Sequence, residues 1–256
     1  MIPKMIEAAL RANQIPFDPE LPEKLSVYLE LLMDWNTRMD LTAVLEEDEM
    51  LDKHFMDSLF ILKTDLLNQV QTLIDVGTGA GFPGLVIAMA CPQINVTLMD
   101  AQQKRLRFLD AVCEETGLSN VAMIHGRAED GGQNRLLREK FDLSTARAVA
   151  PLNILCEYLI PFVKVGGKAI CWKGPALWNE LEQGEKAAAV LGGDVEEPIS
   201  YTVAGREWEH NLLPIRKQRK TDPGYPRGPG LIKARPLCGK FKVDPLTSKM
   251  EGSDAQ

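Results

Sequence analysis

The stretch LIDVGTGAGFPG, residues 73–84, decides the fold class of this chain. Before and within it, Thr72–Val76 is a short apolar run with one acid, which predicts a buried parallel strand. The segment 82–90, FPGLVIAMA, predicts a helix with a proline near its first turn. Between strand and helix lie glycines, whose missing Cβ permits unusual backbone angles and lets a ligand approach the backbone. This order is the start of a nucleotide-type βαβ unit.

The spacing of the glycines distinguishes between two classes of cofactor. A dinucleotide fingerprint, G-x-G-x-x-G, counted from Gly77 would need its third glycine at position 82, where the chain has Phe82. The chain instead has Gly77, Gly79 and Gly81, preceded by Asp75. That form is typical of S-adenosylmethionine (SAM) methyltransferases, so the pattern favours SAM over a nicotinamide dinucleotide.

The rest of the chain predicts a doubly wound α/β fold with three parts. We expect an N-terminal helical extension over residues 1–65, a SAM-binding core over 66–215 and a basic C-terminal tail over 216–256. The predicted sheet is mostly parallel, with an antiparallel pair of strands at its end. Its further strands are expected at 95–99, 121–124, 141–146, 168–174, 195–203 and 207–215, and its helices at 102–116, 152–162 and 178–191.

Three positions after predicted strands are candidates for binding the cofactor. Asp100 ends the second strand about 20 residues past the glycines, where an acid can accept hydrogen bonds from ribose hydroxyls. The alternative is that Asp100 caps the next helix, and both roles can hold together. A backbone N–H of Ala128 or Glu129, after the third strand, could contact an adenine edge. Arg147 follows the fourth strand, where the motifs of amino-methylating and carbon-5 pyrimidine enzymes are absent.

Charge is distributed unevenly along the chain. The net charge is −7, yet the segment from Pro214 to Lys242 holds nine cations and one acid, Asp222. Such asymmetry predicts a surface that faces nucleic acid on an otherwise acidic body, with a solvated tail as the alternative. The predicted RNA contacts are Lys173, Arg216, Lys217, Arg219, Lys220 and Arg227; the other cations of the segment are Lys233, Arg235, Lys240 and Lys242.

Other features narrow the class of protein. No apolar stretch is long enough for a membrane helix, and the first residues lack the apolar core of a signal peptide. The five cysteines show no zinc spacing, so we expect reduced thiols, no metal and a cytoplasmic protein. His54, Asp57 and Ser58 lie close in sequence, but on a helix this spacing also gives a local hydrogen-bonded pair. We expect them at an interface or on the substrate side.

Several separated motifs together resemble one family, the bacterial small-subunit ribosomal RNA methyltransferase G, also called glucose-inhibited division protein B. They span about residues 20–237 and include WNTRMDLTAV, HFMDSL, DVGTGAGFPG, GRAED, TARAVAPL and YPRGPG. The resemblance implies a class I SAM-dependent methyltransferase that modifies N7 of one guanine in 16S ribosomal RNA, free or within the small subunit. It also implies SAM contacts at Gly77, Phe82, Ala128, Glu129 and Arg147, with Asp100 at the ribose position.

The expected chemistry needs no general base. Guanine N7 carries a lone pair and no proton at neutral pH, so catalysis rests on alignment, and Arg147 is expected to position cofactor or RNA phosphate. Rival interpretations are a small-molecule methyltransferase, a noncatalytic RNA-binding protein and an NAD-type oxidoreductase. A monomer is the default expectation, because nothing in the sequence indicates an obligate dimer.

Overall fold

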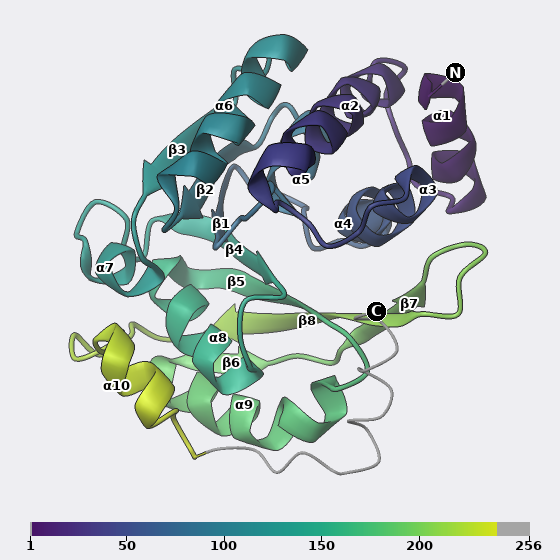
Figure 1. Cartoon of the computed structure of the whole chain (residues 1–256). Helices are drawn as coiled ribbons and strands as arrows, with labels where there is room; N and C mark the ends of the chain where they lie inside the picture. The colour runs from purple at the N-terminus through teal and green to yellow at the C-terminus, as the bar shows by residue number, and fades with distance from the viewer. Residues whose placement is uncertain (1, 240–256) are drawn as a thin grey trace.

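The computed structural model describes residues 2–239, and its centre is one eight-stranded sheet (Figure 1). The strands are β1 (Thr72–Val76), β2 (Asn95–Asp100), β3 (Val121–His125), β4 (Phe141–Arg147), β5 (Val163–Lys173), β6 (Gly193–Val195), β7 (Ile199–Thr202) and β8 (Glu209–Lys217). Their order is β3-β2-β1-β4-β5-β8-β6, with β7 also paired to β8. The pairs from β3 to β5 are parallel, and β8 is antiparallel to β5, β6 and β7. The predicted doubly wound sheet with an antiparallel end is confirmed.

Helices cover both faces of the sheet (Figure 1). One face carries α1 (Ile2–Ala12), α2 (Leu21–Met39), α5 (Gly84–Ala90) and α6 (Gln103–Thr116), and the other carries α8 (Leu152–Leu159) and α9 (Leu177–Leu191). Strand β1 shows how the alternation of side chains builds the two cores. Leu73 packs on the α2 side, whereas Ile74 and Val76 pack on the α8 side. The sequence of a parallel strand that is buried on both faces is therefore a continuous apolar run.

Within the expected helical extension, residues 47–63 form a helical segment that is broken into short pieces. Residues Glu47–Met50 form α3, Leu51–Met56 a π-helical turn (η1), Asp57–Leu59 form α4 and Phe60–Lys63 a 3₁₀ turn (η2). A π-helical turn is wider than an α-helical one and is often found at functional sites. This segment lies against α5 and carries His54 and Asp57 to the edge of the sheet.

The strand that was expected from residue 168 begins earlier, at Val163. Phe141 pairs with Val163 and Leu143 pairs with Lys168, so residues 164–167 bulge out of the ladder. Gly166 and Gly167 therefore lie inside β5. Gly166 has a φ of +92°, and a Cβ on Gly167 would come within 2.5 Å of the Asp142 carbonyl oxygen. The predicted start of this strand was therefore five residues too late, because the bulge extends the pairing back to Val163.

The C-terminal segment is folded back onto the core. Arg216 and Lys217, which were assigned to the tail, are the last residues of β8. The following residues cross to α7 (Ala128–Gln133) and α8, and include α10 (Pro229–Ala234), coloured yellow in Figure 1. Lys240 and Lys242 lie outside the described residues.

Candidate functional site: a cleft above the glycine turn

The glycine turn is held at the carboxyl edge of the sheet by backbone hydrogen bonds. The amides of Gly77 and Thr78 donate to the Met99 carbonyl of β2, at 2.8 Å and 3.1 Å. Gly77 and Gly79 have φ angles of +72° and +60°, which L side chains rarely adopt. A Cβ on Gly79 would meet no protein atom nearer than 3.9 Å, so this backbone faces open space.

Asp100 lies beside this turn and joins it to the next helix. One carboxylate oxygen accepts from the Gly79 amide at 2.9 Å, and the other accepts from the Gln102 amide at 2.8 Å, just before α6. The side chain is buried, with Arg105 3.5 Å from it. Asp100 thus fixes the residue before α6 but accepts from no amide within that helix, and each of its oxygens retains a further lone pair for a ligand.

A cleft runs over the turn in two halves that share Gly77, Asp100, Ala101 and Val149. The half toward the N-terminal helices has a volume of about 440 Å³ and is lined by Thr42, His54, Gly79, Phe82 and Arg147, among others. The other half has a volume of about 380 Å³ and includes Ala128, Glu129, Ile154, Tyr158 and Lys233. Both sizes suit parts of a small organic ligand.

The predicted cofactor residues thus gather at one place, with one exception. Gly77, Gly79, Phe82, Asp100, Ala128, Glu129 and Arg147 all line the cleft. Gly81 is buried, and a Cβ there would collide with the Tyr28 hydroxyl and lie 2.8 Å from a methyl of Leu109. The structure therefore places Gly81 against α2 and α6, where its missing side chain allows close packing.

Arg147 forms the link between the cleft and the N-terminal extension. Its Nη1 donates to the Asp57 carboxylate and to the Lys53 carbonyl, both at 2.8 Å. Its Nη2 donates to His54 Nδ1 at 3.1 Å, and its guanidinium lies 5.0 Å above the centre of the Phe82 ring. The fork of donors that was expected to hold cofactor or phosphate is thus mostly occupied by the protein itself.

Asp57 is the buried centre of this network. Besides Arg147, it accepts hydrogen bonds from Tyr201 Oη at 2.5 Å and His210 Nδ1 at 2.6 Å. Burial opposes its ionisation, but the hydrogen bond from His210 and the charge of Arg147 outweigh burial and lower the pKa of Asp57. The carboxylate therefore carries its charge and ties the extension to β7 and β8.

His54 lies in the cleft as a neutral ring. Burial and the neighbouring Arg147 charge lower its pKa to about 3. Because Nδ1 accepts from Arg147, the proton sits on Nε2, which donates to Thr42 Oγ1 at 2.7 Å. The ring stacks on Phe82 with 4.9 Å between centroids. His54 therefore links the N-terminal extension to Arg147 and Phe82 while also lining the cleft, and Ser58 donates to the His54 carbonyl.

The predicted RNA contacts lie elsewhere, and most are already paired within the protein. Lys173 pairs with Glu180 at 2.6 Å, Arg216 with Glu196 at 2.6 Å, and Arg227 with the buried Glu157 at 2.7 Å. Arg219 donates to the Ala189 carbonyl. These cations thus neutralise acids of the core or satisfy its backbone.

Lys217 and Lys220 differ in their access to solvent. Lys217 is only 1% exposed, donates to the Ile160 carbonyl at 2.8 Å and lies 3.2 Å from Glu139. Burial lowers its pKa to about 8. Lys217 therefore has no surface for a phosphate, contrary to the prediction. Lys220 is exposed and has no ion pair within residues 2–239.

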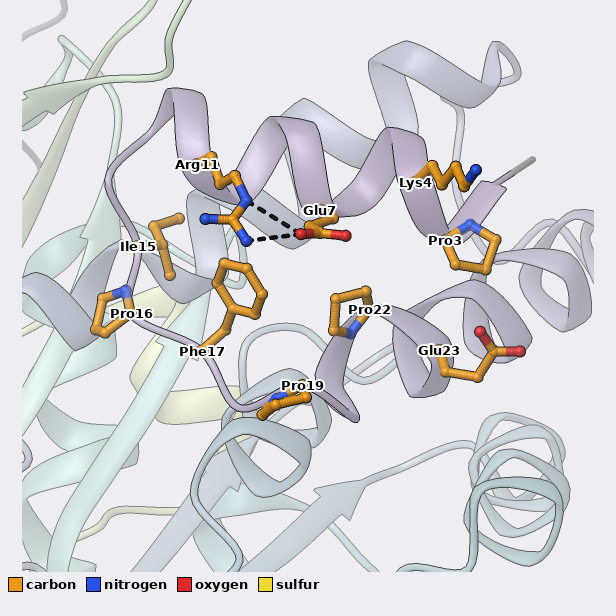
Figure 2. Close-up of a pocket in the computed structure, with 10 residues that line it drawn as sticks. All are labelled: Pro3, Lys4, Glu7, Arg11, Ile15, Pro16, Phe17, Pro19, Pro22 and Glu23. Carbon is orange, nitrogen blue, oxygen red and sulfur yellow. Dashed lines mark hydrogen bonds and ion pairs between the residues drawn. The ribbon is translucent and has the colours of Figure 1, made fainter.

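A separate cavity of about 510 Å³ lies between α1 and α2 (Figure 2). Arg11 donates to Glu7 above the Phe17 ring, and the remaining lining residues are four prolines together with Lys4, Ile15 and Glu23. The cavity shares no lining residue with the cleft and brings no reactive group together.

Over residues 2–239, no group of His, Cys, Asp and Glu side chains is arranged to hold a metal ion. Of the helices in that range, none is long and apolar enough to cross a membrane.

Comparison with known proteins places this chain in a family of methyltransferases. A family model described as rRNA small subunit methyltransferase G matches residues 21–207. The chain belongs to this family. Its members are SAM-dependent enzymes that methylate guanine N7 in 16S ribosomal RNA, and the fold is that of a class I methyltransferase.

Two relatives named "Ribosomal RNA small subunit methyltransferase G" illustrate the match. The one from Alkaliphilus metalliredigens (strain QYMF) is 45% identical over 220 residues, 86% of this chain and 92% of the relative. The one from Alkaliphilus oremlandii (strain OhILAs) is 48% identical over 210 residues, 82% and 88%. The solved 16S rRNA (adenine(1408)-N(1))-methyltransferase from Catenulisporales acidiphilia has a TM-score of 0.48 at 17% identity, covering 59% of this chain and 89% of that chain.

Sequence reasoning missed two charged residues that hold the C-terminal segment on the core. Glu157 is fully buried and was not singled out, although an acid within the apolar run LNILCEYL is a signal for a buried partner. Arg138 was also missed. Its guanidinium donates to four carbonyls, those of Gly132, Thr221, Asp222 and Tyr225.

Proposed function

We propose that the cleft above the glycine turn binds SAM and presents its methyl group to N7 of one guanine in 16S ribosomal RNA. One observation carries the proposal: the Gly79 amide and the Asp100 carboxylate meet at 2.9 Å across the carboxyl ends of β1 and β2. Ligands of open parallel sheets bind outside this edge. The turn leaves bare backbone there, and the acid supplies acceptors for hydroxyl groups.

The residues of the cleft fit the chemical parts of SAM. Gly77 and Gly79 give close backbone approach, and Asp100 has acceptor capacity for a ribose diol. Ala128 and Glu129, with the apolar Ile154, line the half that suits an adenine ring. A cofactor of this kind supplies a methyl group on a positively charged sulfur, which is an electrophile.

The groups near the cleft support transfer without a general base. With SAM bound, the lone pair of guanine N7 would form the bond to the methyl carbon while the methyl–sulfur bond breaks and a neutral thioether leaves, and no proton has to leave in that step. His54 is neutral, with a pKa of about 3 and both ring nitrogens hydrogen-bonded. Asp57 is occupied by three donors. The protein's contribution is therefore orientation of two reactants, which alone can supply a large part of a rate enhancement.

Arg147 is proposed to act on the loop that it begins. Its bonds to Asp57 and His54 fix β4 relative to the N-terminal extension. Of the next two residues, Ala148 lines the half of the cleft beside Phe82, and Val149 lines both halves. Arg147 thus sets the shape of the acceptor side, and any contact to cofactor or phosphate uses its remaining donors.

For RNA, we propose contacts through cations at the protein surface. Lys220 is the member of the predicted set that is exposed and unpaired within residues 2–239, whereas Lys217 is excluded by burial. Arg216, Arg219, Arg227 and Lys173 can reach phosphate only by giving up or sharing their internal partners. Neutralising Lys220 should flatten the dependence of RNA affinity on salt by about one phosphate contact.

The test is transfer of label from SAM carrying a labelled methyl group. Small ribosomal subunits and free 16S ribosomal RNA, both lacking the modification, are incubated with the enzyme and the labelled base is mapped. We expect label on N7 of a single guanine, with the better substrate identifying free RNA or the assembled particle. Label on small molecules only, or on no RNA base, would overturn the proposal. We further propose that the enzyme acts as a monomer in the cytoplasm. Sedimentation of the pure protein tests whether it is a monomer.

A further inference from the structure

Residues 218–237, here called the strap, pack along α7 and α8 through fixed polar contacts. The Arg138 guanidinium donates to the carbonyls of Thr221, Asp222 and Tyr225 at 2.6–3.0 Å. Gln133 Nε2 donates to the carbonyls of Pro223 and Pro226. A chain that hung freely in solvent would make none of these bonds, so the strap is a part of the folded core.

Two further contacts fix the end of the strap that carries α10. Arg227 forms a bidentate pair with Glu157, with Nε to Oε1 at 2.9 Å and Nη2 to Oε2 at 2.7 Å. Glu157 is 0% exposed and Arg227 is only partly exposed, so salt screens this pair less than a surface pair. Ile232 is also fully buried and packs with Ile154 and Tyr158 of α8. These contacts hold α10 in one position.

The residue after Ile232 reaches the cofactor cleft. Lys233 lines the half of the cleft that contains Ala128, Glu129 and Tyr158. Most side chains of this half are apolar, and burial together with the charge of Glu129 raises the pKa of Tyr158 to about 12. A Lys side chain commonly lays its apolar stem over such a surface and keeps its ammonium in water.

We propose that the strap completes the donor pocket, with the aliphatic stem of Lys233 covering the adenine of bound SAM. This inference rests on the proposed function, because it concerns the same cleft. The strap was expected to bind RNA; the structure instead uses Arg227 to dock it and places Lys233 over the cofactor half. The C-terminal segment thereby contributes to affinity for the donor even when no RNA is present.

The test is titration calorimetry of the pure full-length protein with SAM, in the absence of RNA. Lys233→Ala removes the stem and should raise the dissociation constant three- to tenfold. Lys233→Met keeps an apolar stem of similar length and should stay within twofold of the wild type. Arg235→Ala is the matched control, since Arg235 is an exposed cation of the same strap whose side chain does not line the cleft.

The outcomes separate this inference from the proposed function. If the wild type binds no SAM, the proposed function fails first. If the wild type binds SAM and Lys233→Ala binds it equally well, the strap inference is overturned. The same holds if Lys233→Met is as weak as Lys233→Ala, or if Lys233→Ala weakens only RNA binding and its salt dependence, which would make Lys233 a phosphate contact.

Discussion

Replacing Gly79 by alanine tests the cleft with little disturbance of the protein around it. The added methyl group would point into the open space above the turn, where the nearest protein atom is the Gly77 carbonyl oxygen at 3.9 Å. Gly117 offers a matched control at the end of α6. Its φ of +65° is close to the +60° of Gly79, and a Cβ there meets nothing within 4 Å.

The two substitutions should cost similar stability and differ in donor affinity. A side chain in the left-handed region costs about 1–2 kcal/mol, so both variants should lose that amount of unfolding free energy. At Gly79 the methyl group also occupies space that the donor needs. Overfilling a packed site costs about 1–3 kcal/mol, which corresponds to a five- to 150-fold weaker binding of SAM.

Urea unfolding measures the first quantity and titration calorimetry with SAM the second. We expect Gly79→Ala to bind SAM at least fivefold more weakly than Gly117→Ala, while the two unfold at similar urea concentrations. Equal SAM affinity in the two variants would refute the placement of the donor over the glycine turn. A large stability difference between them would show that the open space at Gly79 is not available in solution.

Three further predictions concern the buried charges. Asp57→Asn leaves Arg147 without its buried partner and should lower the unfolding free energy by about 3 kcal/mol at pH 7 in urea, against no more than about 0.5 kcal/mol for the exposed control Asp194→Asn. Because the folded pKa of Asp57 is lowered, this difference should shrink as pH falls below about 4; a constant difference would contradict the charge argument. Lys217 has a folded pKa of about 8, so it binds its proton less readily in the folded protein than in the unfolded chain. The unfolding free energy of the wild type should therefore rise relative to that of Lys217→Met between about pH 8 and 10. Equilibrium unfolding at several pH values measures this difference. Arg147→Lys replaces a planar fork by a single nitrogen, so it cannot reproduce the separate bonds of Nη1 to Asp57 and Nη2 to His54. It should reduce methyl transfer to small subunits at least about tenfold, and unchanged transfer would refute the anchoring role.

The central strands and the glycine turn could be predicted because their signals are local. A strand buried on both faces needs a continuous apolar run, and the turn needs glycine where φ is positive. Both requirements are visible in residues 72–84, and β1 has the predicted bounds. The acid at the end of β2 could likewise be placed from its spacing to the turn, because adjacent parallel strands end at the same edge of the sheet.

The partners of the basic residues could not be predicted, because they are distant in the sequence. Glu157 lies 70 residues before Arg227, and Glu196 lies 20 residues before Arg216. Counting charges over a short segment of sequence includes Arg227 but leaves out Glu157, the acid that neutralises it. The excess of cations in the C-terminal segment therefore reflects docking onto an acidic core as well as any attraction for RNA.

The boundary expected at residue 65 divides the helical extension from the rest of the chain in sequence only. In the folded protein the extension shares the core with the SAM-binding part and contributes residues to the site. Leu25 and Leu29 of α2 share one apolar core with Leu85 of α5 and Leu109 of α6. Asp57 reaches Arg147 across 90 residues of sequence. Since Arg147 starts the loop that lines the cleft, the geometry of methyl transfer depends on how the extension is docked. Cutting the chain between residues 63 and 72 would therefore remove one wall of the active site along with the extension.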